Sequence, residues 1–99
     1  MGRRGIHFVC KNDEGVIDLP DGNFESRAWR VARSTVEAAD YIALHQRKAA
    51  FSYRQGRIIS YRFDAKRPDR YVFVCEPEPA SLEWPGSTTG TNMMAVKRA

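Results

Sequence analysis

The sequence predicts an α+β fold, with a small twisted, mostly antiparallel sheet or open barrel and one or two short helices. The chain has 99 residues, a length typical of one compact domain. Its apolar stretches are short, alternate with polar residues as strands do, and are separated by turn residues. Only one stretch has its apolar residues at helical spacing.

Four stretches have the β-branched and aromatic content of strands, residues 6–9, 41–44, 57–62 and 71–74. Between them we expect a turn-rich connector over residues 11–23 and a polar loop over residues 46–55.

We expect Pro77 and Pro79 to end regular pairing after residue 75, because proline cannot donate a sheet hydrogen bond. Residues 86–99 are rich in Ser, Thr and Gly at their start. We therefore expect one domain, residues 1–85, followed by a flexible tail, residues 86–99.

The segment between residues 27 and 39 is compatible with two structures. Trp29, Ala32, Val36 and Ala39 would share one face of a single helix. Residues 34–37, however, form a capping box with Ser at the N-cap and Glu at N3, and such boxes begin helices. We therefore favour a strand over residues 28–32 followed by a helix over residues 35–39, with the single helix as the alternative.

The positive charge is concentrated in the middle of the chain. The whole chain carries +4, whereas residues 41–71 contain eight basic and two acidic residues, a net charge of +6. Arginine supplies most of it, and its planar fork suits phosphate and carboxylate. This segment is a candidate anion-binding face, and a solvated basic surface is the alternative.

The cysteines and histidines do not form a recognisable metal motif. Cys10 and Cys75 each end an apolar Phe-Val-Cys run, and with His7 and His45 they match no zinc spacing. We expect both thiols to be reduced and buried, with no metal and no cofactor. No signal peptide or membrane span is evident, so we expect a cytoplasmic protein without a membrane partner.

One loop combines the residue types that hold a nucleotide. Tyr53 can stack on a base, Ser52 and Gln55 can hydrogen-bond its edge, and Arg54 and Arg57 can bind phosphate. The alternative is a polar hairpin loop in which the tyrosine is half buried.

Other residues extend this candidate site. Trp29 either stacks on a base or belongs to the core. His45 ends a strand, where it either donates to a phosphate or is satisfied within the protein. Of the alternating pair Tyr61 and Arg62, only one can point into a cleft, and we favour the arginine. The complete predicted binding set is Trp29, His45, Arg47, Lys48, Ser52, Tyr53, Arg54, Gln55, Arg57 and Arg62.

The middle of the chain resembles the core of PUA-like domains. The resemblance lies in an apolar strand, a basic loop and a second apolar strand that begins with glycine: Asp40-Tyr41-Ile42-Ala43-Leu44-His45, the loop, and Gly56-Arg57-Ile58-Ile59-Ser60-Tyr61-Arg62. The resemblance covers about residues 27–75, and Ala39 stands where those domains usually have glycine. It implies a small barrel that holds RNA, or a modified or flipped base, in a basic cleft lined by aromatic residues. It does not by itself imply catalysis.

We therefore expect a non-enzymatic module that binds nucleic acid, RNA or DNA, or a modified nucleotide. The alternative is a small phage or mobile-element protein that uses the same residues to inhibit a host defence complex through an acidic protein surface. A homodimer would stabilise so small a domain. We expect no enzymatic activity, because no serine, cysteine or histidine has the partners that catalysis needs.

Overall fold

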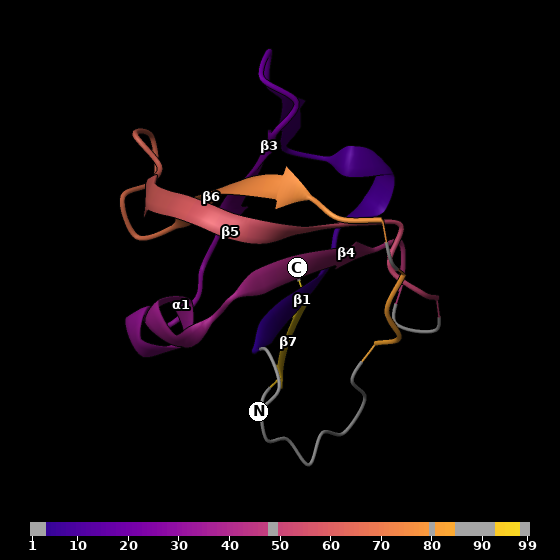
Figure 1. Ribbon diagram of the computed structural model, residues 1–99. Coiled ribbons are helices and arrows are strands. Elements are labelled where there is room, and N and C mark those ends of the chain that lie inside the picture. Colours follow the sequence, from indigo (N-terminus) through magenta and orange to yellow (C-terminus); the bar gives the residue numbers. More distant parts are fainter. Residues whose placement is uncertain (1–3, 48–49, 80, 85–92, 98–99) are drawn as a thin grey trace.

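The computed structural model describes residues 4–47, 50–79 and 81–84, and the backbone of residues 93–97. Its strands form one sheet in the order β2-β3-β6-β5-β4-β1-β7. The sheet curls into an open half-barrel, and α1 lies at one end of it (Figure 1). In chain order the elements are β1 (Gly5–Val9), the 3-10 helix η1 (Lys11–Asp13), β2 (Val16–Asp18), β3 (Phe24–Trp29), α1 (Arg33–Ala38), β4 (Tyr41–His45), β5 (Arg54–Phe63), β6 (Tyr71–Pro77) and β7 (Met93–Lys97).

Most neighbouring strands are antiparallel, and β1 is the exception. Antiparallel ladders join β2 to β3, β3 to β6, β6 to β5 and β5 to β4. Strand β1 runs parallel to both β4 and β7. The prediction of a small sheet or open barrel with a short helix is therefore confirmed, with β1 making the sheet mixed.

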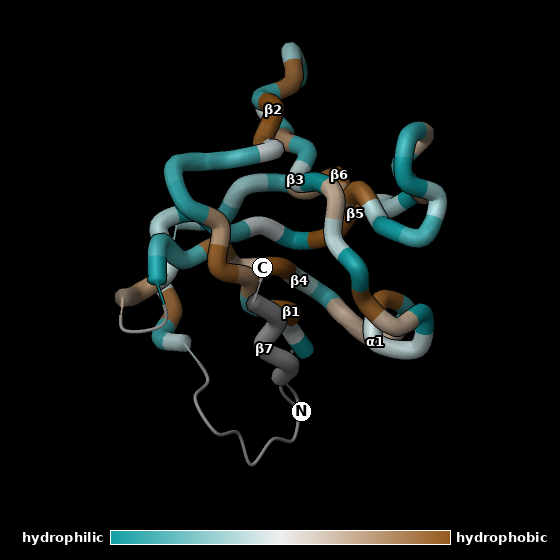
Figure 2. The backbone as a smooth tube through the Cα atoms, turned by 180° about the vertical axis from the view of Figure 1, so that it is seen from behind, coloured by the Kyte–Doolittle hydropathy of each residue, from teal (hydrophilic) through white to brown (hydrophobic). Residues whose placement is uncertain are grey.

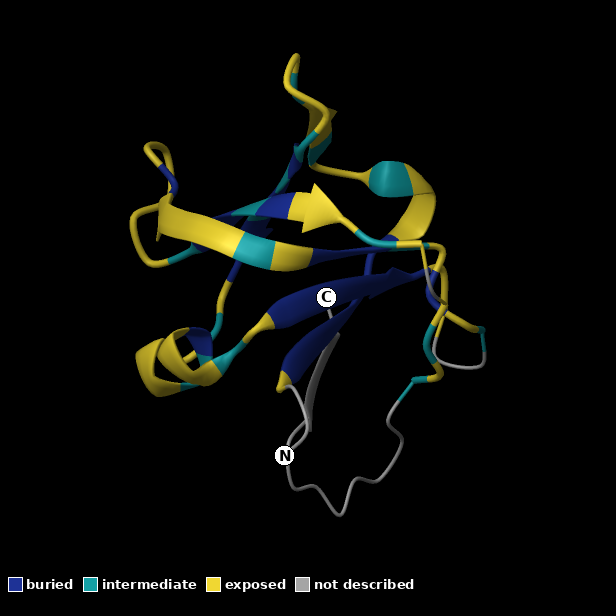
Figure 3. Cartoon of the chain, viewed as in Figure 1, coloured by how far each residue is buried: buried dark blue, intermediate teal, exposed yellow. Residues whose placement is uncertain are grey.

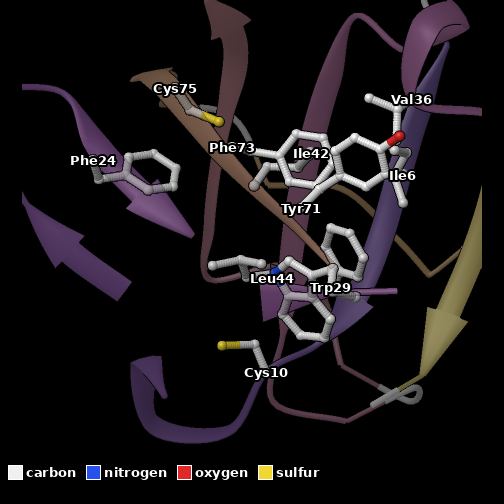
Figure 4. Close-up of a cluster of buried hydrophobic side chains, with 11 residues drawn as sticks. Ile6, Cys10, Phe24, Trp29, Val36, Ile42, Leu44, Tyr71, Phe73 and Cys75 are labelled. Atoms are coloured by element: carbon white, nitrogen blue, oxygen red, sulfur yellow. The ribbon is translucent and has the colours of Figure 1, made fainter. Parts of the chain in front are cut away.

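The core fills the inside of the curled sheet (Figure 4). Alternate residues of each strand point inward, as the pleat requires. Val36 of α1 is buried in the same cluster and fixes the helix against the sheet. The buried cluster consists of Ile6, Phe8, Cys10, Phe24, Trp29, Val36, Ile42, Leu44, Tyr71, Phe73 and Cys75. Both cysteines are free and buried, as predicted.

Strands β1 and β4 are buried along their whole length (Figure 3). Such burial on both faces is typical of strands in parallel pairing. Ile6 and Phe8 face the core, so His7, between them, points to the opposite face of the sheet. Two polar rings, those of His7 and His45, are thus buried outside the apolar core.

Strand β5 contains a bulge that changes which of its side chains face inward. Ile58 lies opposite Cys75, but the next paired residue is Ser60, opposite Val74. Beyond the bulge Tyr61 lies opposite Phe73, and Phe73 is a core residue. Because Ile59 is the extra residue, Tyr61 is on the same face as Ile58 although three positions separate them.

The region before the helix differs from the prediction. Strand β3 begins four residues earlier than the predicted strand, and it pairs with β2 and β6, so the single-helix alternative is wrong. The predicted capping box is also wrong: Ala32 is the N-cap, Ser34 lies inside the helix, and no side chain caps the N-terminus. Glu37 pairs instead with Arg33, one helical turn away, at 2.8 Å.

Two predicted loops contain strands. Val16–Asp18 of the predicted connector forms β2, paired with β3. Strand β5 begins at Arg54 rather than at residue 57, because Arg54 and Gln55 pair with Leu44 and Ala43 of β4.

The predicted flexible tail also contains a strand. The backbone of Met93–Lys97 forms β7 beside β1, in register from Gly5↔Met93 to Val9↔Lys97. Pairing satisfies the backbone groups of β1 that β4 does not reach. The remainder of the predicted tail lies outside the described residues.

Gly56 is required where β5 lies very close to its neighbour β6. A Cβ at this position would lie 2.7 Å from the carbonyl oxygen of Glu76 and 2.9 Å from Cβ of Cys75. We expect Gly56→Ala to lower the free energy of unfolding by about 1–3 kcal/mol, measured by urea denaturation. Ser60→Ala, at an exposed position of the same strand, is the matched control and should change it by less than about 0.5 kcal/mol. Equal effects of the two substitutions would contradict the close approach.

Candidate nucleic-acid interface

Arg54 is held by two carboxylates. Its guanidinium donates to both oxygens of Asp13, at 3.2 and 2.9 Å, and to Oδ1 of Asp18 at 3.0 Å. Burial disfavours the charge, but the hydrogen bonds to Asp13 and Asp18 outweigh it and raise the pKa of Arg54. The guanidinium also lies 5.0 Å from the centroid of the Phe24 ring. Arg54 therefore joins η1 and β2 to β5, whereas we expected it to bind phosphate.

Ser52 and Gln55 are buried and hydrogen-bond to each other within the protein. The Ser52 hydroxyl donates to Oε1 of Gln55 at 2.6 Å and accepts the backbone N–H of Leu82 at 2.9 Å. The backbone N–H of Ser52 donates to the carbonyl of Leu82 at 2.8 Å. These contacts attach residues 81–84 to the β4–β5 connection and leave neither side chain exposed to a ligand.

Tyr53 anchors η1. Its hydroxyl donates to the carbonyl of Cys10 at 2.6 Å and accepts the backbone N–H of Asp13 at 3.3 Å. Burial, followed by the hydrogen bond to Cys10, raises the pKa of Tyr53. Tyr53 is 37% exposed, but its hydroxyl is held by the protein, so the arrangement is closer to the polar hairpin loop that we gave as the alternative.

The remaining predicted cations differ in their surroundings. Arg57 pairs with Glu76 at 2.8 Å and Arg62 with Glu25 at 3.2 Å, and both arginines are largely exposed. Arg47 is exposed, and Lys48 lies outside the described residues. The acidic residues near both ends of the chain therefore neutralise much of the central +6 segment.

Trp29 belongs to the core. Its side chain is 2% exposed and stacks on Phe8 with ring centroids 3.9 Å apart. The indole N–H donates to the hydroxyl of Ser26 at 2.9 Å. This is the core role given above as the alternative to base stacking.

His45 belongs to a buried chain of hydrogen bonds. Nδ1 of His45 lies 2.9 Å from the carbonyl oxygen of Ala50, Nε2 of His45 lies 2.9 Å from Nδ1 of His7, and Nε2 of His7 lies 3.2 Å from the hydroxyl of Tyr41. A carbonyl only accepts, so Nδ1 of His45 carries the proton. With both rings neutral, His7 then donates to His45 and Tyr41 donates to His7. Every ring nitrogen is satisfied, so of the two roles given above for His45 the structure shows the histidine satisfied within the protein.

Burial keeps both rings neutral. It lowers the pKa of His7 to about 4, with a further contribution from His45, and it lowers the pKa of His45 against the opposing hydrogen bond to Ala50. The indole of Trp84 packs edge-on against both rings, with centroids 6.4 Å from His7 and 5.1 Å from His45. These buried hydrogen bonds join β1 to β4.

Two aromatic side chains at the far end of β5 are exposed. Tyr61 is 42% exposed and Phe63 57% exposed. They lie opposite Phe73 and Tyr71 of β6, so they share one face of the sheet. Strand β4 pairs with β5 only as far as Arg57, so this end of β5 extends beyond it.

Basic side chains follow these rings in the turn between β5 and β6. Lys66 and Arg67 are exposed, and among the described residues no carboxylate lies within ion-pair distance of either. The turn is mostly hydrophilic and stands at the same end of the molecule as α1 (Figures 1 and 2). We call Tyr61, Phe63, Lys66 and Arg67 the hairpin surface.

Sequence reasoning missed most of this surface. It considered Tyr61 but favoured Arg62, which the structure pairs with Glu25. One signal was present: the predicted strand at 57–62 is longer than the predicted strand at 41–44, with which it pairs in the structure. The end of the longer strand therefore has to project beyond the shorter one.

Comparisons with protein-family models, with curated proteins and with solved structures found no match, so the resemblance to PUA-like domains stays a prediction. Within the described residues, no group of three or more His, Cys, Asp or Glu side chains is arranged to hold a metal ion. The same part of the chain has no helix with the length and apolar character of a membrane span.

Because His7 and His45 are hydrogen-bonded as neutral rings, we expect the folded protein to become less stable in mild acid. The unfolded chain takes up a proton on His7 near its ordinary pKa of 6.5, but the folded protein does so only near 4, so folding weakens as the pH falls through this interval. We expect the free energy of unfolding to drop by roughly 1–2 kcal/mol between about pH 7 and pH 5, measured by urea denaturation. His7→Gln should be less stable at neutral pH but show a flatter dependence. Parallel pH profiles for the two proteins would show that His7 is not the titrating group.

Proposed function

We propose that this protein is a non-enzymatic module that binds nucleic acid through the hairpin surface. The proposal is carried by one observation: two exposed aromatic rings lie on the same hairpin as Lys66 and Arg67, for which no described carboxylate lies within ion-pair distance. Cations that follow the phosphates, combined with aromatic rings that take the bases, are the usual elements of such binding.

The charges favour the hairpin surface over the β4–β5 loop. A phosphate that bound Arg54 would have to displace Asp13 and Asp18, which hold it through three hydrogen bonds. Lys66 and Arg67 need no such exchange.

Charge reversal in the turn tests the proposal. We expect Lys66→Glu with Arg67→Glu to weaken binding of a labelled, mixed-sequence oligonucleotide by more than about tenfold near 50 mM salt, and to lower the salt dependence by about one phosphate contact per residue. Fluorescence anisotropy across a salt series measures both quantities.

The matched control reverses two exposed cations elsewhere. Lys11→Glu with Arg47→Glu changes the net charge equally but lies outside the hairpin. It should weaken binding by less than about threefold if the hairpin surface is the site. Equal losses in the two double variants would contradict the assignment. Absence of nucleic-acid binding, together with a stoichiometric protein partner recovered after nuclease treatment, would favour the inhibitor alternative.

A further inference from the structure

We infer that the ligand of the hairpin surface is a single strand, with Tyr61 and Phe63 each stacking on one of two neighbouring bases. This inference rests on the proposed function and specifies its substrate class. It is based on three observations: the spacing of the two rings along β5, their contacts with Tyr71, and their exposure to solvent.

The two rings are spaced along one strand face. Tyr61 lies opposite Phe73 and Phe63 opposite Tyr71, so one intervening residue separates them on the same side of β5. Positions two apart on a strand are roughly 6.6–6.8 Å from each other. Neighbouring bases can meet both rings at this spacing only if they separate from one another, as bases of a single strand can.

The ring of Tyr71 contacts the rings of both Tyr61 and Phe63. Its centroid lies 4.9 Å from that of Phe63, with the planes tilted by 31°, and 5.8 Å from that of Tyr61 in an edge-to-face contact. Tyr71 itself is 6% exposed and belongs to the core. The rings of Tyr61 and Phe63, which we call the platform, are therefore held in place before a ligand binds. Such preorganisation lowers the entropic cost of binding.

The surroundings of the rings match a nucleic-acid strand in charge and leave the rings accessible. Lys66 and Arg67 follow in the turn at one end of the platform. On the β4 side, pairing stops at Arg57 and leaves the end of β5 unpaired within the described part of the sheet.

A duplex would leave the two rings unused. Its bases are stacked on one another inside the helix, and it offers a protein its phosphates and groove edges. Lys66 and Arg67 could still attract a duplex, but the rings would gain nothing. Base stacking on aromatic side chains is instead sequence-tolerant and specific for unpaired strands.

The experiment compares variants that lack the ring of Tyr61 or Phe63 with variants that keep a ring, and it measures their binding to defined oligonucleotides. The probes are labelled oligothymidylate and oligouridylate of about twelve nucleotides, and a duplex of the same length, each titrated by fluorescence anisotropy. Both single strands should bind at least tenfold more tightly than the duplex. Phe63→Leu and Tyr61→Leu should each weaken single-strand binding by roughly 5- to 150-fold and change duplex binding by less than twofold.

Three variants serve as controls. Tyr61→Phe and Phe63→Tyr keep a ring and should bind within about twofold of the natural sequence, which separates stacking from a folding defect. Phe51→Leu removes another exposed aromatic ring, 58% exposed but outside the hairpin, and should have no effect. Thermal melting of each variant verifies that it is folded.

The outcomes separate this inference from the proposed function. If the duplex binds as tightly as the single strands, or if the leucine variants bind normally while Lys66→Glu with Arg67→Glu does not, the stacking inference is wrong and the proposed function stands. If neither single strands nor duplex bind the natural sequence, the proposed function fails as well.

Discussion

The structure depends on strand β1, which is paired along both edges and buried on both faces. Its inward side chains, including Ile6 and Phe8, complete the apolar core, while His7 lies on the opposite face. A buried imidazole is tolerated only if both of its nitrogens are satisfied, and His45 and Tyr41 of β4 supply those partners. The parallel register of β1 and β4 brings these groups together, so the hydrogen-bond chain and the strand pairing stabilise each other.

Ion pairs between distant segments determine where the positive charge remains available. Asp13, Asp18 and Glu25 come from the first third of the chain and pair with arginines of β5. Each pair satisfies a guanidinium and fixes one strand or turn against another. Within the part of the chain that the structure describes, Lys66 and Arg67 of the β5–β6 turn have no such carboxylate partner, although both come from the basic segment.

Local patterning was sufficient to predict the main strands but not their extent. Alternation located β1, β4, β5 and β6 and the burial of both cysteines, because these depend on side chains within each stretch. Strand β2 and the first half of β3 were missed because their stability comes from pairing with each other and with β6. The capping box failed because Ala32 already begins the helix and Glu37 is taken by Arg33. The candidate site was harder to predict, since the partners of Arg54 are separated from it by 36 and 41 positions.

The bulge at Ile59 determines which chemistry the end of β5 presents. Side chains of a regular strand alternate strictly, so a strand that continued evenly from the inward-facing Ile58 would turn Ser60 and Arg62 toward the core side. The additional residue reverses this parity and gives that side to Tyr61 and Phe63 instead. The presence or absence of this one extra residue thus determines whether polar or aromatic side chains lie on this side of the end of β5. An insertion or deletion at this position would exchange the two surfaces while leaving the composition of the strand almost unchanged.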